Sequence, residues 1–397
     1  MVLRWLSESG GALEAKRALV RVDFEGALAD GAIVDELPIR SVLPSIELLR
    51  QRGARIMLAT HLGRPRGKPA PRWSLAPVAE RLRDLLGEIV FTDDCVGDGV
   101  RRLAAELRPG QILLLENVGF HPGEERDDEV FARQLAANAD CYVGDAFACA
   151  HQARASNHAA ARLFEQRLAG LLLEKEIRAL SRLVEAPARR CVAVLGGARL
   201  TDQMTLISRL VDRVDALVLG GALAHTFLAA SGVDVGSSPI EASRVAGART
   251  IIDGAARKRV ELLLPLDHVV ASAPDATTGI EFVDAKSIPD GRVGLDIGPR
   301  TRQRIAEAIA DAQTVFWHGP LGAAEREPFG AGTLAVAQAL AAACRRGAFG
   351  VVCGGDTVRA IGRAGLAQAI SHLSTAGAAA LEFVEGRTLP GLTALSN

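Results

Sequence analysis

Short runs of β-branched and aliphatic residues alternate along the chain with longer alanine- and leucine-rich segments whose apolar positions recur with a helical period. The runs predict strands at residues 18–22, 55–59, 112–115, 141–143, 191–195, 216–219, 314–317 and 350–353. The segments between them predict amphipathic helices, among them residues 39–50, 75–86, 128–137, 201–211 and 302–310. Strands that are apolar at nearly every position are typical of parallel sheets covered by helices on both faces. The pattern therefore predicts an α/β fold built from βαβ units.

The spacing of these units predicts two lobes. A length of 397 residues exceeds what one hydrophobic core usually supports. Gly170 precedes a long apolar helix, after one set of βαβ units and before the next. We expect two Rossmann-like lobes with parallel sheets, residues 1–170 and 171–384, joined by that hinge helix. Residues 385–397 begin with turn-forming residues and are expected to return to the first lobe.

Composition narrows the class of protein. Hydrophobic residues make up 49% of the chain and the formal net charge is −1, which gives no reason to expect nucleic acid or a membrane surface as a partner. The six cysteines lack the Cys-x-x-Cys spacing of zinc and thiol-redox motifs. No apolar run of membrane-spanning length and no basic-then-apolar leader is present. We expect a soluble, cytoplasmic protein.

Polar or glycine-rich residues follow the predicted strands one after another. In doubly wound sheets, ligands bind at the carboxyl ends of the strands. Any one of these residues could be a cap or turn former, but their repetition predicts a ligand site. The paired Gly196 and Gly197 also allow backbone amides to approach a phosphate closely, with Thr201 or Asp202 opening the next helix. The other residues are Asp23, His61, Arg64, Glu116, Asn117, Asp145, His151, Arg199, Gly220, Gly221, His318, Gly319, Pro320, Gly354, Gly355, Asp356 and Thr357.

These motifs resemble those of the phosphoglycerate kinase family over essentially the whole chain. The first lobe carries Arg21-Val22-Asp23-Phe24, His61-Leu62-Gly63-Arg64-Pro65, Leu114-Leu115-Glu116-Asn117, Asp145-Ala146-Phe147 and Ala150-His151. The second carries Leu195-Gly196-Gly197-Ala198, Trp317-His318-Gly319-Pro320, Gly354-Gly355-Asp356-Thr357 and Ser374-Thr375. The resemblance implies the phosphoglycerate kinase fold and phosphoryl transfer between 1,3-bisphosphoglycerate or 3-phosphoglycerate and ADP or ATP with Mg²⁺, in glycolysis or carbon fixation. It also implies a monomer whose ligand is a small phosphorylated or carboxylate molecule.

The resemblance also implies roles for individual residues. The acceptor-substrate residues would be Asp23, Glu25, His61, Arg64, His151 and Arg154 in the first lobe. The nucleotide-binding residues would be Gly196, Gly197, Arg199, Gln203, Gly221, Pro320, Glu325, Gly354, Gly355, Asp356 and Thr357 in the second lobe. Arg199, Arg64 and His61 would be catalytic, and Asp356 would bind the magnesium ion. Asp356 could equally be only a helix N-cap, and His61 could be a structural histidine.

The acceptor motifs depart from the family where phosphoglycerate is gripped. Pro38, Gly119 and Gln152 stand where the family has arginines. Glu25 replaces an asparagine and adds a negative charge beside Asp23. Because a charged bidentate hydrogen bond is worth roughly 1.5 to 3 kcal/mol, losing three would remove about 4.5 to 9 kcal/mol, or roughly three to six decades of affinity. Arg154, two residues beyond Gln152, could compensate in part.

The nucleotide motifs depart in the same direction. Arg199 stands where a family lysine meets the transferring phosphoryl group, and Gln203 where a second lysine meets the nucleotide phosphates. Arginine keeps the charge but not its compact shape, and glutamine loses the charge. Ala222 replaces a glycine of the adenine-side turn, and Cys353 replaces the first glycine of the family's Gly-Gly-Gly-Asp-Thr. Each added side chain reduces how closely backbone amides can approach a phosphate. We therefore expect weakened binding of ATP and ADP.

Two hypotheses remain open. In the first, the chain is a phosphoglycerate kinase homologue whose usual activity is weak or absent, a divergent enzyme or a pseudoenzyme. In the second, it is an active phosphotransferase that uses shifted arginines or a less anionic carboxylate substrate. A nicotinamide dehydrogenase is disfavoured, because no Gly-x-Gly-x-x-Gly follows a strand with an acidic residue about 20 positions later.

Overall fold

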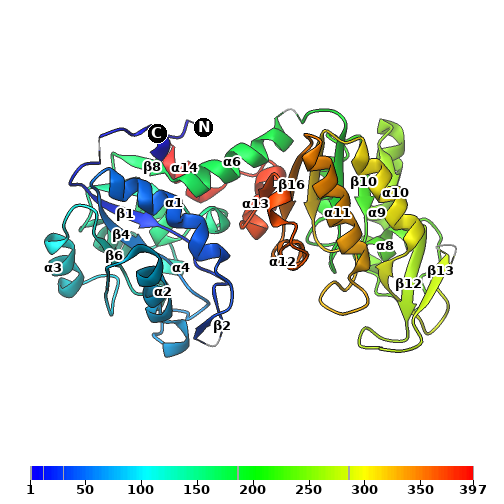
Figure 1. The fold of residues 1–397 in the computed structure, drawn as a ribbon, viewed down its shortest axis with the longest axis horizontal. Helices are drawn as coiled ribbons and strands as arrows, with labels where there is room; N and C mark the ends of the chain where they lie inside the picture. The colour runs from blue at the N-terminus through cyan, green and yellow to red at the C-terminus, as the bar shows by residue number, and fades with distance from the viewer. Residues whose placement is uncertain (1, 12, 30, 186, 285–286, 397) are drawn as a thin grey trace. The chain divides into compact units, whose positions relative to one another are not determined.

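The chain forms two compact units. The computed structural model describes residues 2–11, 13–29, 31–185, 187–284 and 287–396, so Met1 and Asn397 at the ends of the predicted first lobe lie outside it. Unit 1 comprises Met1–Arg178 and Arg387–Asn397, and unit 2 comprises Ala179–Gly386. The division lies within helix α6 (Leu171–Val184), which therefore contributes to both units (Figure 1). Helix α14 (Pro390–Leu395) returns to unit 1, where Gly391 N donates to Ala150 O at 2.9 Å.

Unit 1 is built on a six-stranded parallel sheet with the order β5-β6-β4-β1-β7-β8. The central strands are buried at almost every position, as the sequence pattern predicted. The strands are β1 (Arg17–Arg21), β4 (Arg55–Ala59), β5 (Ile89–Phe91), β6 (Ile112–Leu114), β7 (Cys141–Gly144) and β8 (Arg167–Ala169), beside a small hairpin of β2 (Leu28–Ala29) and β3 (Ala32–Ile33). The helices are α1 (Leu37–Gln51), α2 (Ala76–Leu86), α3 (Asp98–Glu106), α4 (Pro122–Glu125) and α5 (Glu129–Ala136).

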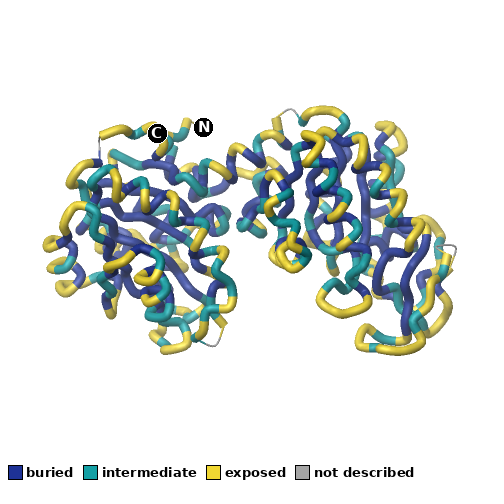
Figure 2. The backbone as a smooth tube through the Cα atoms, in the orientation of Figure 1, coloured by how far each residue is buried: buried dark blue, intermediate teal, exposed yellow. Residues whose placement is uncertain are grey.

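Unit 2 repeats this plan with the order β11-β10-β9-β15-β16-β17, again all parallel. These strands are β9 (Cys191–Leu195), β10 (Ala216–Leu219), β11 (Glu261–Leu263), β15 (Thr314–His318), β16 (Phe349–Cys353) and β17 (His372–Leu373). The helices are α7 (Met204–Leu210), α8 (Leu223–Ala230), α9 (Val245–Lys258), α10 (Pro299–Ala310), α11 (Ala331–Arg345), α12 (Gly355–Arg363) and α13 (Gly377–Val384). Figure 2 shows that the buried positions of each unit follow its strands.

The predicted α/β class with two parallel sheets is confirmed, and the differences concern short elements. Unit 2 also contains an antiparallel sheet of β12 (Asp267–Ala271), β13 (Glu281–Asp284) and β14 (Val293–Ile297), which the apolar pattern did not reveal. The helix expected to open at Thr201 or Asp202 begins only at Met204. The reason is that the carboxylate of Glu241 binds the backbone amides of Leu200 and Thr201 and holds them in a turn. No helix in the described part of the chain is long and apolar enough to cross a membrane.

Asp145, at the carboxyl end of β7, serves the fold. Its Oδ1 accepts a hydrogen bond from Leu173 N at 3.0 Å, and Ser45 Oγ accepts one from Leu171 N at 2.9 Å. These two side chains satisfy amides at the start of α6 that have no partner within the helix. A Cβ on Gly170 would lie 2.3 Å from Asp145 Oδ1, so the glycine is required for this contact. Burial raises the pKa of Asp145 to about 7.

Candidate functional site

His61 lies in unit 1 at the centre of the predicted acceptor site. It follows β4, it is 7% exposed, and its Nδ1 is 2.9 Å from a terminal nitrogen of Arg21. Because a guanidinium can only donate hydrogen bonds, His61 Nδ1 accepts and the proton of the neutral ring is on Nε2. Burial, together with the charges of Arg21 and Arg154, lowers the pKa of His61 to about 4 despite the opposing effect of Asp23. His61 is therefore a neutral N–H donor near pH 7.

Arg21 is held by a buried network behind the site. Its side chain is 1% exposed, and its Nε donates to Ser156 Oγ at 2.7 Å. Ser156 in turn donates its hydroxyl to Glu124 Oε1 at 2.6 Å and its amide to Glu124 Oε2 at 2.9 Å. The Tyr142 hydroxyl donates to Ser156 O at 2.9 Å. The carboxylate of Glu124 thus compensates the charge of Arg21 through Ser156. Arg21 in turn holds His61 through its Nδ1.

Two carboxylates lie close to the His61 ring, Asp23 near the nitrogen that faces Arg21 and Glu25 near the other nitrogen. Asp23 Oδ1 is 3.9 Å from His61 Nδ1, and Glu25 Oε2 is 4.0 Å from His61 Nε2. Glu25 is held there, since its amide donates to Asp23 Oδ1 at 2.9 Å and its Oε2 accepts from Gly63 N at 2.8 Å. The structure therefore brings Asp23, Glu25 and His61 together. This group carries negative charge where the resemblance requires an anion site.

The remaining acceptor-site residues supply less charge than the family pattern implies. Arg154 acts on the pKa of His61 from nearby, but its Nε donates to Gln152 Oε1 at 2.8 Å. The Gln152 amide nitrogen also lies 3.2 Å from His151 Nε2, so Gln152 links the two predicted ligands. Arg64 is exposed on the loop after β4. Arg64 and Arg154 are thus the two arginines among the predicted acceptor-site residues.

Glu116 and Asn117 build loops on the acceptor side. Glu116 Oε1 accepts from Leu75 N at 2.9 Å. Asn117 Oδ1 accepts from Leu62 N at 3.2 Å and from Gly119 N at 2.9 Å. These bonds hold the loop after β4 beside the turn that contains Gly119. The two residues position the site without any requirement to touch a ligand.

In unit 2, a cavity of about 480 Å³ lies where the predicted nucleotide residues converge. This volume falls within the range of roughly 300 to 1,000 Å³ that is typical of small-molecule sites. Of the predicted residues, Gly197, Gly221, Pro320, Glu325 and Asp356 line it. A Cβ on Gly221 would lie 2.7 Å from Gly197 N, so the two glycine turns approach as closely as they do only because side chains are absent.

Two altered residues of the phosphate loop point to partners within the protein. Gln203 is 5% exposed and its Nε2 donates to Gly196 O at 2.8 Å. It therefore stabilises the loop at the position where a lysine would offer charge to a phosphate. Arg199 is exposed, and its Nε lies 3.4 Å from Asp202 Oδ2. The positive charge of Arg199 is partly neutralised by its own loop.

Asp356 is a suitable magnesium ligand. It lies in the first turn of α12, it is exposed, and it pairs with Arg359. Its alternative interpretation as the helix N-cap is wrong, because Gly354 occupies that position. Hard cations prefer carboxylate oxygen, and Mg²⁺ usually binds through one or two protein carboxylates and phosphate oxygens. The site fits a nucleotide-bound magnesium ion held by Asp356. Gly355 and Thr357 flank it in the same helical turn.

Three polar residues of the cavity wall were missed by the sequence reasoning: His225, His268 and Asp296. The two imidazole rings lie 6.0 Å apart, and burial lowers the pKa of each to about 4. Burial raises the pKa of Asp296 to about 6, although its Oδ2 accepts from Gly332 N at 2.8 Å. Asp296 could have been found, since Gly298 and Pro299 follow it in a strand-to-helix turn. The histidines stand inside apolar segments and give no such signal.

Comparison with known proteins agrees with the resemblance. The sequence model of the phosphoglycerate kinase family matches residues 10–387. Phosphoglycerate kinase of Anaeromyxobacter dehalogenans is 47% identical over 386 residues, which cover 96% of this chain and 97% of that protein. That of Desulfosudis oleivorans is 48% identical over 382 residues, 96% of each chain. The solved phosphoglycerate kinase from Coxiella burnetii has a TM-score of 0.86 and 37% identity, covering 98% of both chains.

The bond between Arg21 and His61 predicts the protonation of the histidine. In ¹⁵N-resolved spectra of the full chain, we expect the His61 Nε2–H tautomer at pH 7 and a ring that stays mostly neutral down to pH 5. His158 is an internal control, because its Nδ1 lies 2.6 Å from Asp127 Oδ2 and must carry a proton. Arg21→Met should move the His61 pKa toward its ordinary value of about 6.5. A doubly protonated His61 at pH 7, or an Nδ1–H tautomer, would contradict the assignment.

Proposed function

The chain belongs to the phosphoglycerate kinase family, and from this premise we propose that it binds the family's substrates but transfers phosphate between ATP and 3-phosphoglycerate only slowly. Unit 1 would hold the acceptor and unit 2 would hold ADP or ATP with Mg²⁺. The observation that carries the proposal is the charge around His61. Two carboxylates and a neutral imidazole occupy this position, and arginines are missing at Pro38, Gly119 and Gln152.

This arrangement acts against a phosphorylated acceptor. Phosphoryl transfer depends almost entirely on positioning and on stabilising charge, so missing cations lower both affinity and rate. His61 can donate one hydrogen bond from Nε2, and Arg64 and Arg154 can bind one anionic group between them. Glu25 opposes that group, because its carboxylate accepts a hydrogen bond from Gly63 N and lies beside His61.

In the nucleotide site, the charged residues that would stabilise the transferring phosphate differ from the family more than the shape of the cavity does. The glycine turns and the cavity of about 480 Å³ support binding of a nucleotide. Asp356 would hold magnesium, which supplies charge neutralisation on the phosphates when it is bound. Arg199 is the remaining phosphate-loop cation, and Gln203 donates to Gly196 O. We therefore propose weakened but retained binding of ATP and ADP, by a monomer in the cytoplasm.

A second function is favoured by one specific observation. Arg154 lies close enough to His61 to act on its pKa, so it can reach the acceptor site. With Arg64, it would suffice for a substrate that carries a carboxylate and no phosphate. In that case the chain would be an active phosphotransferase for a less anionic acceptor.

The proposal predicts slow turnover on the family's substrate. In a coupled assay of ATP-dependent phosphorylation of 3-phosphoglycerate, the rate should lie at least about a thousandfold below the roughly 1 to 100 per second of typical kinases. The phosphoglycerate kinase of Anaeromyxobacter dehalogenans, measured in parallel, provides the reference. Asp356→Ala, which removes the proposed magnesium ligand, should lower the rate further. An ordinary kinase rate for the unmodified chain would refute the proposal.

Restoring the missing cations should restore acceptor binding cooperatively. We expect Pro38→Arg, Gly119→Arg and Gln152→Arg together to raise affinity for 3-phosphoglycerate far more than the sum of the single changes, because three groups would grip one anion. Pro38 lies in the first turn of α1 and Gln152 is exposed, so both positions accept a long side chain. Gly119 is tighter, with a Cβ there 3.0 Å from Asn117 Oδ1.

The matched control for the triple arginine variant has side chains of similar length at the same positions but without the positive charge. Pro38→Gln with Gly119→Gln leaves Gln152 in place and gives three neutral side chains of similar length. Calorimetric titration with 3-phosphoglycerate should show a gain for the arginine variant only. Equal affinities for the two variants would mean that these positions do not face a common anion.

A further inference from the structure

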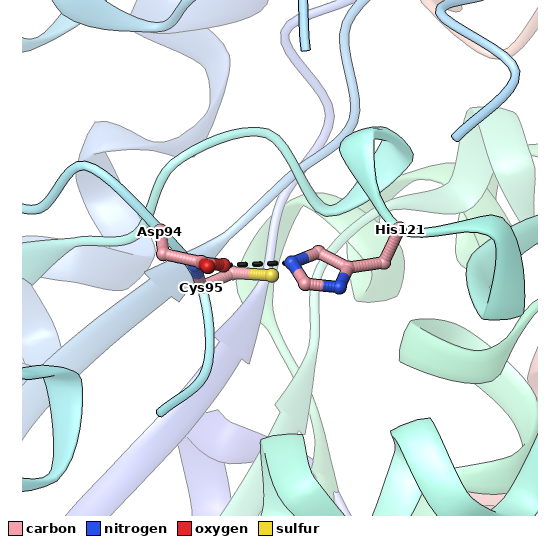
Figure 3. Close-up of side chains that lie close together, drawn as sticks. All are labelled: Asp94, Cys95 and His121. Atoms are coloured by element: carbon pink, nitrogen blue, oxygen red, sulfur yellow. Dashed lines mark hydrogen bonds and ion pairs between the residues drawn. The ribbon is translucent and has the colours of Figure 1, made fainter. Parts of the chain in front are cut away.

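Three potential metal ligands converge in unit 1 from two loops that do not contain His61. Asp94 and Cys95 lie in the turn that follows β5, and His121 lies between the turn Val118–Phe120 and helix α4. Figure 3 shows the three side chains pointing toward one another. One ligand atom from each lies within 4.8 Å of the others, and His121 Nε2 is 2.7 Å from Asp94 Oδ1. Among the described residues, this is the one such group of three.

The three side chains are held in place by the fold. Asp94 Oδ1 accepts from Cys95 N at 2.6 Å, and Asp94 O accepts from Thr92 Oγ1 at 2.6 Å. The His121 ring stacks on Phe131 with ring centroids 4.8 Å apart and planes inclined by 16°. A site in which the ligands are already oriented loses little conformational entropy when an ion binds. These contacts therefore make metal binding more favourable than it would be if the three side chains were flexible.

The exposure of the three residues defines an open site. Cys95 is 1% exposed and forms the floor, whereas the side chains of His121 and Asp94 are 29% and 49% exposed and form the rim. Three protein ligands at a surface leave the fourth position of a tetrahedral ion to water. Burial, and after it the charges of Asp94 and Glu124, raise the pKa of the Cys95 thiol well above its ordinary value.

The ligand types select the metal. A thiolate, an imidazole nitrogen and a carboxylate oxygen suit zinc and similar divalent transition metals, whereas Mg²⁺ and Ca²⁺ prefer oxygen alone. We propose that Asp94, Cys95 and His121 form a binding site for a zinc-type divalent ion with one exchangeable water ligand. As the metal–sulfur bond forms, the Cys95 thiol releases its proton to solvent. The hydrogen bond between His121 Nε2 and Asp94 is replaced by a bond from each residue to the ion: the Nε2 proton leaves to solvent and Nδ1 takes up a proton from solvent, so the neutral ring binds through Nε2.

The position of the site connects it to the acceptor side. His121 follows the turn that contains Gly119, and Glu116 N donates to Asp94 O at 3.5 Å. A bound ion would therefore tie the turn after β5 to the loop of residues 116–121. Binding to the native state alone stabilises a protein, so the metal should raise the thermal unfolding temperature.

Cobalt spectroscopy of the untagged full chain tests the proposal, because Co²⁺ reports on thiolate ligation without any assay of activity. We expect one equivalent of Co²⁺ to give a thiolate-to-cobalt charge-transfer band and tetrahedral visible bands, and Zn²⁺ to displace it. Cys95→Ser should remove the charge-transfer band. Cys141→Ser, a buried cysteine of the same unit outside the cluster, should leave it unchanged.

A second variant keeps the test decisive if Cys95→Ser fails to fold. His121 is partly exposed, so His121→Gln should fold and should weaken Zn²⁺ binding by at least about tenfold in competition with a chromophoric chelator. The absence of a charge-transfer band in the unmodified chain would overturn the proposal. So would a band that persists in Cys95→Ser, or Zn²⁺ affinity unchanged in His121→Gln.

Discussion

The buried guanidinium of Arg21 is the constraint on which the acceptor side depends. A charge with 1% exposure must be surrounded by acceptors, and the chain supplies Ser156, the Val22 carbonyl and His61 Nδ1. Because the guanidinium cannot lose its proton or accept a bond, it decides the tautomer of His61. Burial, with a smaller contribution from the charge of Arg21, lowers the pKa of that ring and keeps it neutral. The charge of Arg21 is thus used in hydrogen bonds within the protein and does not face a ligand. The site itself contains a neutral donor, His61, beside two carboxylates.

Both units combine a preserved scaffold with altered charges. The chain is 47% identical to a phosphoglycerate kinase over 386 residues, and its glycine turns still pack without room for a side chain. Pro38, Gln152 and Arg199 lie at partly or fully exposed positions, where replacing a side chain costs little packing energy. Gln203 is the exception, since it is buried and bonds to Gly196 O. The packing that determines the fold is therefore preserved, whereas the charged positions to which we assign function are changed.

The sequence was sufficient for the long elements and for the family, because apolar strands and glycine motifs carry local signals. It was insufficient wherever a role depends on contacts between distant residues. Arg21 and Glu124 are 103 positions apart (124 − 21), and only the fold shows that Ser156 connects them. The cavity histidines and the antiparallel sheet of unit 2 likewise gave no periodic signal. The proposed metal ligands do not form a Cys-x-x-Cys motif, because they come from two loops, and the sequence therefore did not reveal them.

The proposed function requires that the acceptor site lacks the charge that recognises a phosphate. Calorimetric titration of the unmodified chain with 3-phosphoglycerate and with glycerate tests this directly, since the two ligands differ only in the phosphate group. We expect affinities within about tenfold of each other, equivalent to less than about 1.4 kcal/mol. A preference for 3-phosphoglycerate of about a thousandfold or more would show that other cations recognise the phosphate, and would contradict the proposed function.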